Sequence, residues 1–366
     1  MQVLGSKAQG ERLERMKASA RFKDGVFHNS LPVGAGLKKG SGLTTMKEFM
    51  CGGQRRVPTG VLPVVNPLDQ WLKAAQSGLR ATWLGHSTVL LEIDGMRVLT
   101  DPVWGERVSP LPFAGPKRFH PVPVRIDQLP PLDAVVISHD HYDHLDYPSI
   151  QQLIAMDAPF VTSLGVGAHL EAWGAPSGRI TELDWWESKR IGDLTITASP
   201  SQHFSGRSVA DRNRTSWSSL AMRGRRHSVF FSGDTGLTRE YVEIKEKLGP
   251  FDLIMLEVGA WHPAWGDIHL GPENALQAHA LLGGGAFLPV HWGTFNLAFH
   301  AWDEPAELLV KLAPNSAPLV MPRLGQPIEP GHVQSIDTWW REVEEAETEP
   351  AASASAPVEE LAEPID

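Results

Sequence analysis

The sequence predicts an α/β fold in which the functional groups lie at the ends of strands. Three observations support this prediction. Short apolar runs recur along the chain, helical stretches lie between several of them, and four of the runs lead into a histidine or an aspartate. Open α/β folds build their sites at the carboxyl ends of strands, because the strands hold the loops rigidly and the loops carry the chemistry.

The composition is that of a soluble globular protein with one large domain or two ordinary ones. The chain has 366 residues, 42% of them hydrophobic and 21% charged, which is ample material for a core. No run of eighteen apolar residues occurs, so we expect no transmembrane helix, and the charged first segment lacks a secretory signal. The single cysteine, Cys51, excludes an internal disulfide framework and a thiolate-based zinc site, and it suits the reducing cytoplasm.

The net charge of −10 is unevenly distributed along the chain. Residues 1–60 hold eleven Lys and Arg against four Asp and Glu, whereas residues 343–366 hold eight acids and no base. We therefore divide the chain into a basic arm with an extended connector (1–78), a main domain (79–342) and a disordered acidic tail (343–366). The basic arm either packs on the body or touches anionic lipid headgroups. No nucleic-acid partner is expected.

Regular structure is expected from residue 81 onward. Residues 81–93 are extended, Asp94-Gly95 supplies a hairpin turn, and residues 96–100 form the returning strand. A Pro-rich stretch over residues 110–131 follows, too irregular to be core. Further strands are expected at 132–138, 193–198, 228–234, 251–259 and 286–290, and helices at 145–156, 165–173, 241–248 and 271–282. The last helix opens with a proline in its first turn.

The central motif is His139-Asp-His-Tyr-Asp-His144, directly after the strand expected at residues 132–138. Imidazole nitrogens and carboxylate oxygens are ligands that zinc, manganese and iron accept. The alternative is a polar loop that is rich in histidine by chance. The metal interpretation is favoured because His203, Asp234 and His291 each follow an apolar strand of their own.

The number of candidate ligands indicates two metal ions. A catalytic zinc ion uses three protein ligands and keeps one position open, so seven ligands suit two divalent ions, preferably Zn²⁺, with one ligand shared. Asp234 is the predicted bridge, because a carboxylate has two oxygens. We assign three residues to one ion (His139, His141, His203) and three to the other (Asp143, His144, His291).

Residues around the ligands are expected to orient them or to bind substrate. Metal-bound imidazoles usually donate their other N–H to a carboxylate or carbonyl. Asp101, at a strand end, is the best candidate for this role. His86 is another, unless it only caps its loop. Three arginines close to His203 either bind a phosphate or belong to a solvated loop (Arg207, Arg212, Arg214).

These residues resemble a known group of enzymes. The H-x-H-x-D-H motif, Gly233-Asp234 and His291 resemble the metallo-β-lactamase superfamily, which implies an αββα sandwich with a dinuclear metal site. Further motifs resemble N-acyl-phosphatidylethanolamine-hydrolysing phospholipase D. They are Trp83-Leu-Gly-His86, Leu99-Thr-Asp-Pro102, Gly115-Pro-Lys-Arg-Phe119, Glu182-Leu-Asp-Trp-Trp-Glu187, Ser201-Gln-His203, Gly233-Asp-Thr-Gly236 and His291-Trp-Gly-Thr-Phe295.

The resemblance implies a zinc-dependent phosphodiesterase that cleaves a phospholipid on the headgroup side of the phosphate. It also implies peripheral contact with the inner membrane face and a homodimer. A metal-bridging hydroxide is the expected nucleophile, with Asp143 orienting it. His269 is expected to contact the phosphate or protonate the leaving alkoxide, unless it is structural.

Three rival functions remain open from the sequence. The first is a metal-dependent hydrolase of a soluble lactone or phosphosugar ester. The second is a diiron redox protein, although diiron members of the superfamily favour glutamate where this chain has His141. The third is a non-catalytic scaffold, which the complete ligand set disfavours.

Overall fold

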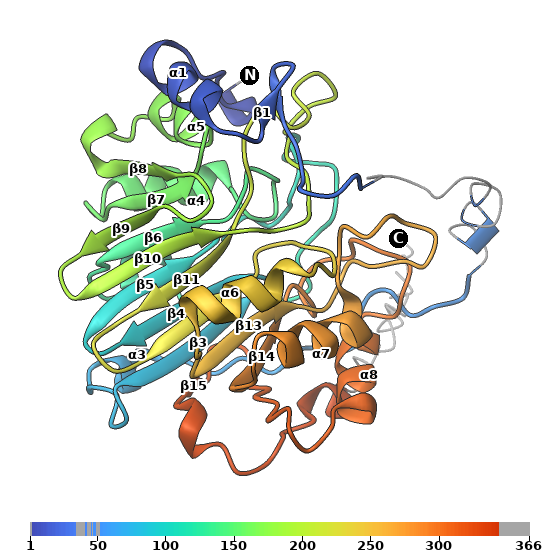
Figure 1. The fold of residues 1–366 in the computed structure, drawn as a ribbon. Coiled ribbons are helices and arrows are strands. Elements are labelled where there is room, and N and C mark those ends of the chain that lie inside the picture. The colour runs from blue at the N-terminus through green and yellow to red at the C-terminus, as the bar shows by residue number, and fades with distance from the viewer. Residues whose placement is uncertain (1, 34–40, 42–44, 46, 49–51, 344–366) are drawn as a thin grey trace, which may run out of the picture.

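The computed structural model describes residues 2–33, 41, 45, 47–48 and 52–343 of the chain. Two mixed sheets of seven and six strands stack face to face, and helices cover their outer faces (Figure 1). This arrangement confirms the αββα sandwich.

The first sheet has the strand order β15-β3-β4-β5-β6-β7-β8. It is antiparallel from β15 to β5 and parallel from β5 to β8. Alternate residues face opposite sides, as strand geometry requires. In β6, Val136 belongs to the main core cluster, while Val135 and Ile137 pack in the cluster of the covering helices. The strands are β3 (Leu79–Gly85), β4 (Thr88–Ile93), β5 (Met96–Thr100), β6 (Ala134–Ile137), β7 (Phe160–Ser163), β8 (Ile180–Leu183) and β15 (Pro327–Ile328). The helices on this side are α3 (Leu68–Trp71), α4 (Tyr147–Ile154) and α5 (Gly167–Ala172).

The second sheet has the order β14-β13-β12-β11-β10-β9. Its β12, β13 and β14 are parallel, and the remaining pairs are antiparallel. Tyr241 and Ile244 of α6 and Ala275 of α7 pack in the main core. The strands are β9 (Ser188–Ile191), β10 (Leu194–Ser199), β11 (Ser219–Arg223), β12 (Ser228–Phe231), β13 (Leu253–Glu257) and β14 (Ala286–Val290). The helices are α6 (Glu240–Leu248), α7 (Gly271–Leu281) and α8 (Glu304–Leu312).

One strand that was expected to be continuous is interrupted in the structure. Residues 81–93 are not one extended run, because β3 and β4 are two antiparallel strands joined at His86 and Ser87. Gly85 has φ +114° and His86 has φ +52°, so the chain reverses through left-handed backbone. His86 thereby comes to the end of β3 instead of lying inside a strand.

The other expected strands and helices are present, with ends shifted by a few residues. The strand expected at 228–234 is shorter, since β12 ends at Phe231 and leaves Asp234 in the following loop. Several elements were not expected from the sequence, namely α1 (Gly10–Ala18), β1 (Phe22–Lys23), β2 (Val26–Phe27), α3, α8, β7, β8, β9, β11 and β15. They are short, and polar residues interrupt their apolar pattern.

The first segment packs on the body of the protein. A short 3₁₀ helix (Gln2–Leu4), α1 (Gly10–Ala18) and a hairpin of β1 (Phe22–Lys23) and β2 (Val26–Phe27) lie over α5 (Figure 1). Arg12 forms an ion pair of 2.6 Å with Glu182, and Arg21 one of 2.9 Å with Asp184. Several bases of the arm therefore face acids of the body. The acidic tail, apart from Val343, lies outside the described residues, and the domain boundaries stay a prediction.

Tryptophans join the beginning and the end of the main domain. Trp83 of β3 stacks on Trp292 at 5.4 Å between ring centroids, and Trp292 stacks on Trp339 at 5.6 Å. All three are buried. Residues that are far apart in the sequence thus form one aromatic stack within the main core.

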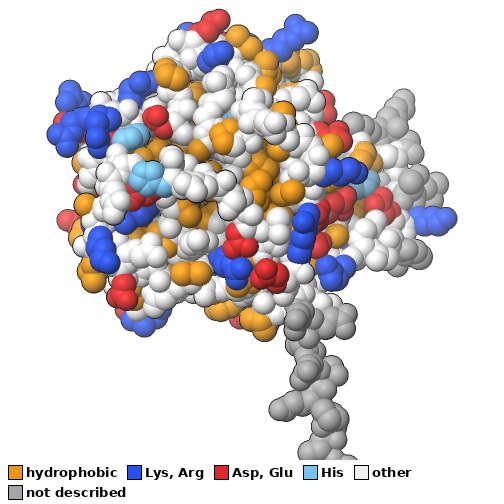
Figure 2. Space-filling model, turned by 90° about the horizontal axis from the view of Figure 1, so that it is seen from below, with side chains coloured by type: hydrophobic (Ala, Val, Ile, Leu, Met, Phe, Trp, Pro, Cys, Tyr) orange, Lys and Arg blue, Asp and Glu red, His pale blue; other side chains and the backbone are white. Residues whose placement is uncertain are grey.

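On the face shown in Figure 2, apolar side chains gather toward the middle, and acidic and basic side chains lie interspersed mainly around them. Neither sign of charge forms a continuous patch on that face. Within the part of the chain that the structure describes, every helix is too short or too polar to cross a bilayer.

Candidate metal centre

The structure brings together all seven predicted ligands, which come from four strand ends. His139 follows β6, His203 follows β10, Asp234 follows β12 and His291 follows β14. Gly233 allows the close approach of the two sheets here. It has φ +54°, and a Cβ at this position would lie 2.6 Å from the Cβ of Ser138.

The first cluster contains His139, His141, His203 and Asp234, whose facing atoms all lie within 4.8 Å of one another. The Nδ1 of His141 lies 2.8 Å from the Nε2 of His139 and 3.3 Å from the Nε2 of His203. The Oδ2 of Asp234 lies 3.8 Å from His139 Nε2 and 3.6 Å from His203 Nε2. Three nitrogens and one oxygen therefore converge on a single point.

The second cluster contains His86, Asp143, His144 and His291, again within 4.8 Å. The Oδ2 of Asp143 lies 3.2 Å from His291 Nε2 and 3.5 Å from His144 Nε2. The Oδ1 of Asp234 lies 3.1 Å from His144 Nε2 and 3.2 Å from His291 Nε2. Asp234 thus presents one oxygen to each cluster, which is the geometry a bridging carboxylate needs.

His86 lies inside the second cluster and not behind it. Its Nε2 is 3.0 Å from Asp143 Oδ2, and its ring centroid is 4.0 Å from that of His291. Burial and the neighbouring His291 lower the pKa of His86 to about 3, so its ring is neutral. A neutral ring here either orients Asp143 by donating to it or would offer a further nitrogen to a bound ion.

Asp101 holds ligands of both clusters. Its Oδ2 lies 2.6 Å from His144 Nδ1 and accepts from the hydroxyl of Ser138 at 2.6 Å. The same hydroxyl lies 2.9 Å from His139 Nδ1. The Oδ1 of Asp101 accepts from the Ser138 backbone N–H at 2.7 Å. Asp101 therefore lies directly behind the ligands, in the position predicted for it.

Glu257 is a residue of this site that was not predicted from the sequence. It ends β13, is fully buried, and its Oε2 lies 2.8 Å from His269 Nδ1. Its Oε1 accepts from the backbone N–H groups of Thr235 and Leu270. The signal was present, because a glutamate ends the apolar run Leu253-Ile-Met-Leu-Glu257. His269 itself lies beside the clusters, with its ring 5.0 Å from that of His203.

Of the three arginines near His203, only Arg207 departs from both predicted alternatives, because Arg212 and Arg214 are exposed on a loop. Arg207 is buried, and its Nε, Nη1 and Nη2 donate to the backbone carbonyls of Val3, Asp140 and Leu145. Its guanidinium therefore holds the protein backbone, which is neither the phosphate-binding role nor the solvated position that the sequence suggested. Arg212 is exposed and lies over the ring of Phe204 at 4.8 Å. Arg214 is exposed and lines a separate cavity.

The electrostatics differ between the two clusters. Burial and neighbouring imidazoles hold the pKa of His139 well below its usual value, so this ring is neutral. For His291, burial disfavours the charged ring, but Asp234, Asp143 and Glu257 together raise its pKa to about 10. Burial opposes the charge on His144 too, and the surrounding carboxylates nevertheless raise its pKa. The carboxylates therefore create a field that stabilises a buried cation in the second cluster.

Two buried polar atoms of the site lack hydrogen-bond partners in the described part of the chain, and a bound metal ion would give each of them a partner. His144 Nε2 and Asp234 Oδ1 are buried and have no hydrogen-bond partner within the described residues, although they are 3.1 Å apart. Unpaired buried polar atoms are costly. A cation between them would satisfy both, and histidine with carboxylate is a donor set that Zn²⁺ accepts. The buried clusters are consistent with a dinuclear metal site.

The fold and the site together define a metal-dependent hydrolase, and the chain belongs to the metallo-β-lactamase superfamily. The model of the "Beta-lactamase superfamily domain" matches residues 96–292. Two solved structures share the fold. They are a metallo hydrolase of Ignicoccus hospitalis (22% identity, TM-score 0.52, 68% of this chain and 97% of that one) and an isothiocyanate hydrolase from Delia radicum gut bacteria (21%, 0.54, 68% and 98%).

Other proteins are more similar to this chain in sequence than the two solved structures are. An uncharacterized protein of Mycobacterium tuberculosis is 45% identical over 88% of each chain. The N-acyl-phosphatidylethanolamine-hydrolyzing phospholipase D 1 of Caenorhabditis elegans is 40% identical, over 70% of this chain and 76% of that one. The mitochondrial enzyme of the same description from Saccharomyces cerevisiae is 34% identical, over 63% of this chain and 51% of its own length.

Proposed function

We propose that the protein is a phospholipase D type phosphodiesterase that hydrolyses N-acyl-phosphatidylethanolamine-like phospholipids with two Zn²⁺ ions. The observation that carries the hydrolytic part is the convergence of the two clusters on the oxygens of Asp234. The lipid part is supported by the 40% identity to the Caenorhabditis elegans phospholipase.

When bound, two such ions lower the pKa of water and stabilise negative charge on phosphoryl oxygens. The residues of the chain would hold the two ions and orient the attacking water. His139, His141 and His203 would hold one ion, and Asp143, His144 and His291 the other. Asp143 is held by His86, whose Nε2 lies 3.0 Å from its Oδ2, and a carboxylate oriented in this way would accept a hydrogen bond from the attacking water.

His269 is the proposed general acid for the leaving alkoxide. Glu257 engages its Nδ1, which leaves Nε2 as the ring nitrogen for the substrate. Burial opposes the charged ring, yet Glu257 and Asp234 raise its pKa. A protonated imidazole beside the metal clusters is suited to protonate an alkoxide as it departs.

A phospholipid substrate requires access to a lipid surface, and one loop beside the site is suited to provide it. Leu111 and Phe113 are 48% and 76% exposed at the tip of the Pro-rich loop. The root of this loop, at Val108, packs in one cluster with Tyr142 of the metal motif. An apolar loop tip of this kind can enter the interfacial region of a bilayer. The expected homodimer and cytoplasmic location remain predictions.

The test is a substrate panel assayed with the metal-loaded protein and again after chelation. N-acyl-phosphatidylethanolamine should yield phosphatidic acid and an N-acylethanolamine, and the chelator should abolish turnover. Soluble phosphodiesters, phosphosugar esters and lactones complete the panel. Turnover of lactones or phosphosugar esters without any cleavage of phosphodiesters would overturn the proposal in favour of the soluble-ester hydrolase.

A further inference from the structure

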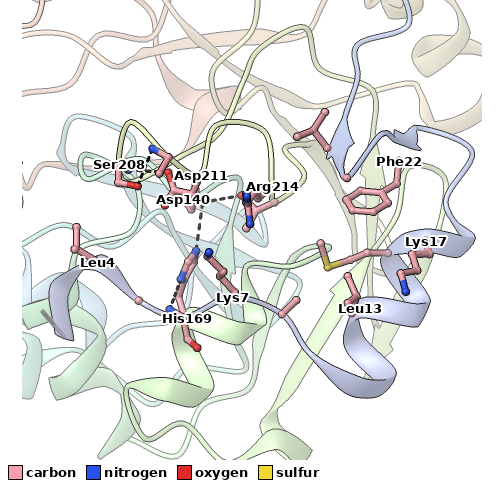
Figure 3. Close-up of a pocket in the computed structure, with 18 of the residues that line it drawn as sticks. Leu4, Lys7, Leu13, Lys17, Phe22, Asp140, His169, Ser208, Asp211 and Arg214 are labelled. Atoms are coloured by element: carbon pink, nitrogen blue, oxygen red, sulfur yellow. Dashed lines mark hydrogen bonds and ion pairs between the residues drawn. The ribbon is translucent and has the colours of Figure 1, made fainter.

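A cavity of about 560 Å³ lies beneath the N-terminal segment, apart from the metal centre (Figure 3). None of the seven predicted metal ligands lines it. One wall comes from residues 4–26 and the other from residues 208–215, with Asp140 and His169 between them. Its volume falls within the range of about 300–1,000 Å³ that is usual for small-molecule sites.

The wall from the N-terminal segment is largely apolar. α1 contributes Leu13 and Met16, and the following hairpin contributes Phe22 and Val26. Figure 3 shows Leu13 and Phe22 on the same side of the cavity. An apolar wall of this kind favours a hydrocarbon group, since burying one releases ordered water at both surfaces.

Most acidic groups of the lining already have partners. Asp140 accepts from Thr215 Oγ1 and from the backbone N–H of Gly206, both at 2.7 Å. Asp211 accepts from the backbone N–H groups of Arg207 and Ser208 at 3.0 and 2.8 Å. Asp24 is exposed at the rim. The oxygens of two of the three carboxylates are therefore already hydrogen-bonded to fixed donors of the protein.

Among the Lys and Arg side chains that line the cavity, one forms an ion pair. Lys17 pairs with Glu14 at 2.7 Å. Lys7 and Arg214 also line the cavity, and within the described residues their side chains form no ion pair or hydrogen bond. Figure 3 shows both side chains between His169 and the apolar wall. The cavity thus combines an apolar wall with two exposed basic side chains that form no ion pair among the described residues.

We propose that this cavity binds an amphiphile that has a hydrocarbon chain and one anionic head group. The chain lies against Leu13, Met16 and Phe22, and the head group lies between Lys7 and Arg214. A free fatty acid and an alkyl phosphate share this chemistry. The inference goes beyond the proposed function, because it involves neither the metal ions nor the hydrolysed bond.

Isothermal titration of the full chain with dodecanoate, dodecyl phosphate and dodecanol, each below its micellar concentration, tests the proposal. We expect saturable binding of the anions with one site per chain, and dodecanol at least tenfold weaker. Whichever anion binds more tightly identifies the head group. Equal affinity for dodecanol, or no saturable binding of either anion, would overturn the proposal.

Three variants locate the binding site. Lys7→Glu combined with Arg214→Glu should weaken binding of the tighter anion at least tenfold, and Ala210→Trp should abolish it by filling the cavity from an exposed loop position. Lys73→Glu combined with Lys311→Glu, at two exposed positions outside the cavity lining, is the matched double charge reversal and should leave binding unchanged. Circular dichroism confirms that each variant is folded. Unchanged affinity in both cavity variants would place the amphiphile elsewhere and refute the site.

Discussion

Replacing Asp101 by asparagine should impair metal binding without removing any ligand. The two oxygens of Asp101 face three donors: the backbone N–H and hydroxyl of Ser138 and the Nδ1 of His144. An asparagine amide has only one oxygen. Either orientation of the amide therefore places its NH₂ group against a donor. When that donor is His144 Nδ1, the imidazole is favoured to move its proton to Nε2, the atom that faces Asp234.

The size of the expected loss in metal affinity follows from this tautomer shift. Loss of a carboxylate partner behind a metal-bound histidine costs about 10- to 100-fold in metal affinity, which corresponds to about 1.4–2.7 kcal/mol. We expect the ion of the second cluster to be affected directly. The first cluster should respond less, because Asp101 reaches His139 only through the Ser138 hydroxyl.

The assay is a competition titration with a zinc chelator, combined with elemental analysis of the purified protein. Wild type should hold two ions per chain, and Asp101→Asn should lose one of them at a chelator concentration that wild type resists. Asp146→Asn is the matched control. It alters a buried carboxylate that caps α4 through Ser149 and accepts from Gly105, so it should lower stability but keep both ions. Full metal affinity in Asp101→Asn would refute the orienting role.

Three other predictions follow from the geometry. The side chain of Asp94 is 2% exposed, and although burial alone would raise its pKa, the backbone and side-chain donors of Arg226 and His227 lower it to about 2. The usual value is about 3.9, so this carboxylate contributes about 2 kcal/mol of stability that is present above pH 4 and lost as the pH falls towards 2. Urea unfolding should show this acid loss, and Asp94→Asn should remove it; an unchanged pH dependence in the variant would contradict the assignment. Glu257→Gln should lower the pKa of His269, so the alkaline limb of the kcat profile should move to lower pH, and a profile that keeps its shape would argue against the dyad. Phe113→Asp should weaken sedimentation with anionic phospholipid vesicles at least tenfold, because a fully buried phenyl side chain is worth about 1.5–3 kcal/mol. The comparably exposed Leu72 provides the control Leu72→Asp, which should sediment as wild type does, and parallel losses in both would exclude a specific lipid loop.

Much of the site could be predicted because its ligands follow strands. An apolar run that leads into a histidine or an aspartate recurs at His139, His203, Asp234 and His291, and this pattern predicts that the four side chains meet at one edge of the sheets. The bridging position of Asp234 followed from chemistry alone, since an imidazole presents only one lone pair to a metal ion. The structure agrees with this placement on both oxygens of the carboxylate.

Other features of the site could not be predicted, because they depend on the directions of side chains and on reversals of the backbone. The spacing of residues in the sequence does not encode either of these. Arg207 is only four residues from His203, yet its guanidinium donates to the backbone carbonyls of the metal motif's own loop. The turn at His86 lacks an Asn-Gly or Asp-Gly signal, so two strands resembled one. Glu257 was overlooked because a single acid at the end of a hydrophobic strand is common, and only its contact with His269 distinguishes it.

The way the first sheet is closed has a consequence for how the chain folds during synthesis. β3 forms early in the sequence, but its outer edge is covered by β15, about 240 residues later, and its Trp83 is covered by Trp292 and Trp339. Until those residues emerge from the ribosome, the nascent chain presents an open strand edge with an uncovered indole. Exposed edges of this kind pair readily with other chains. The growing polypeptide is thus most prone to aggregate before β15 and Trp339 have been made.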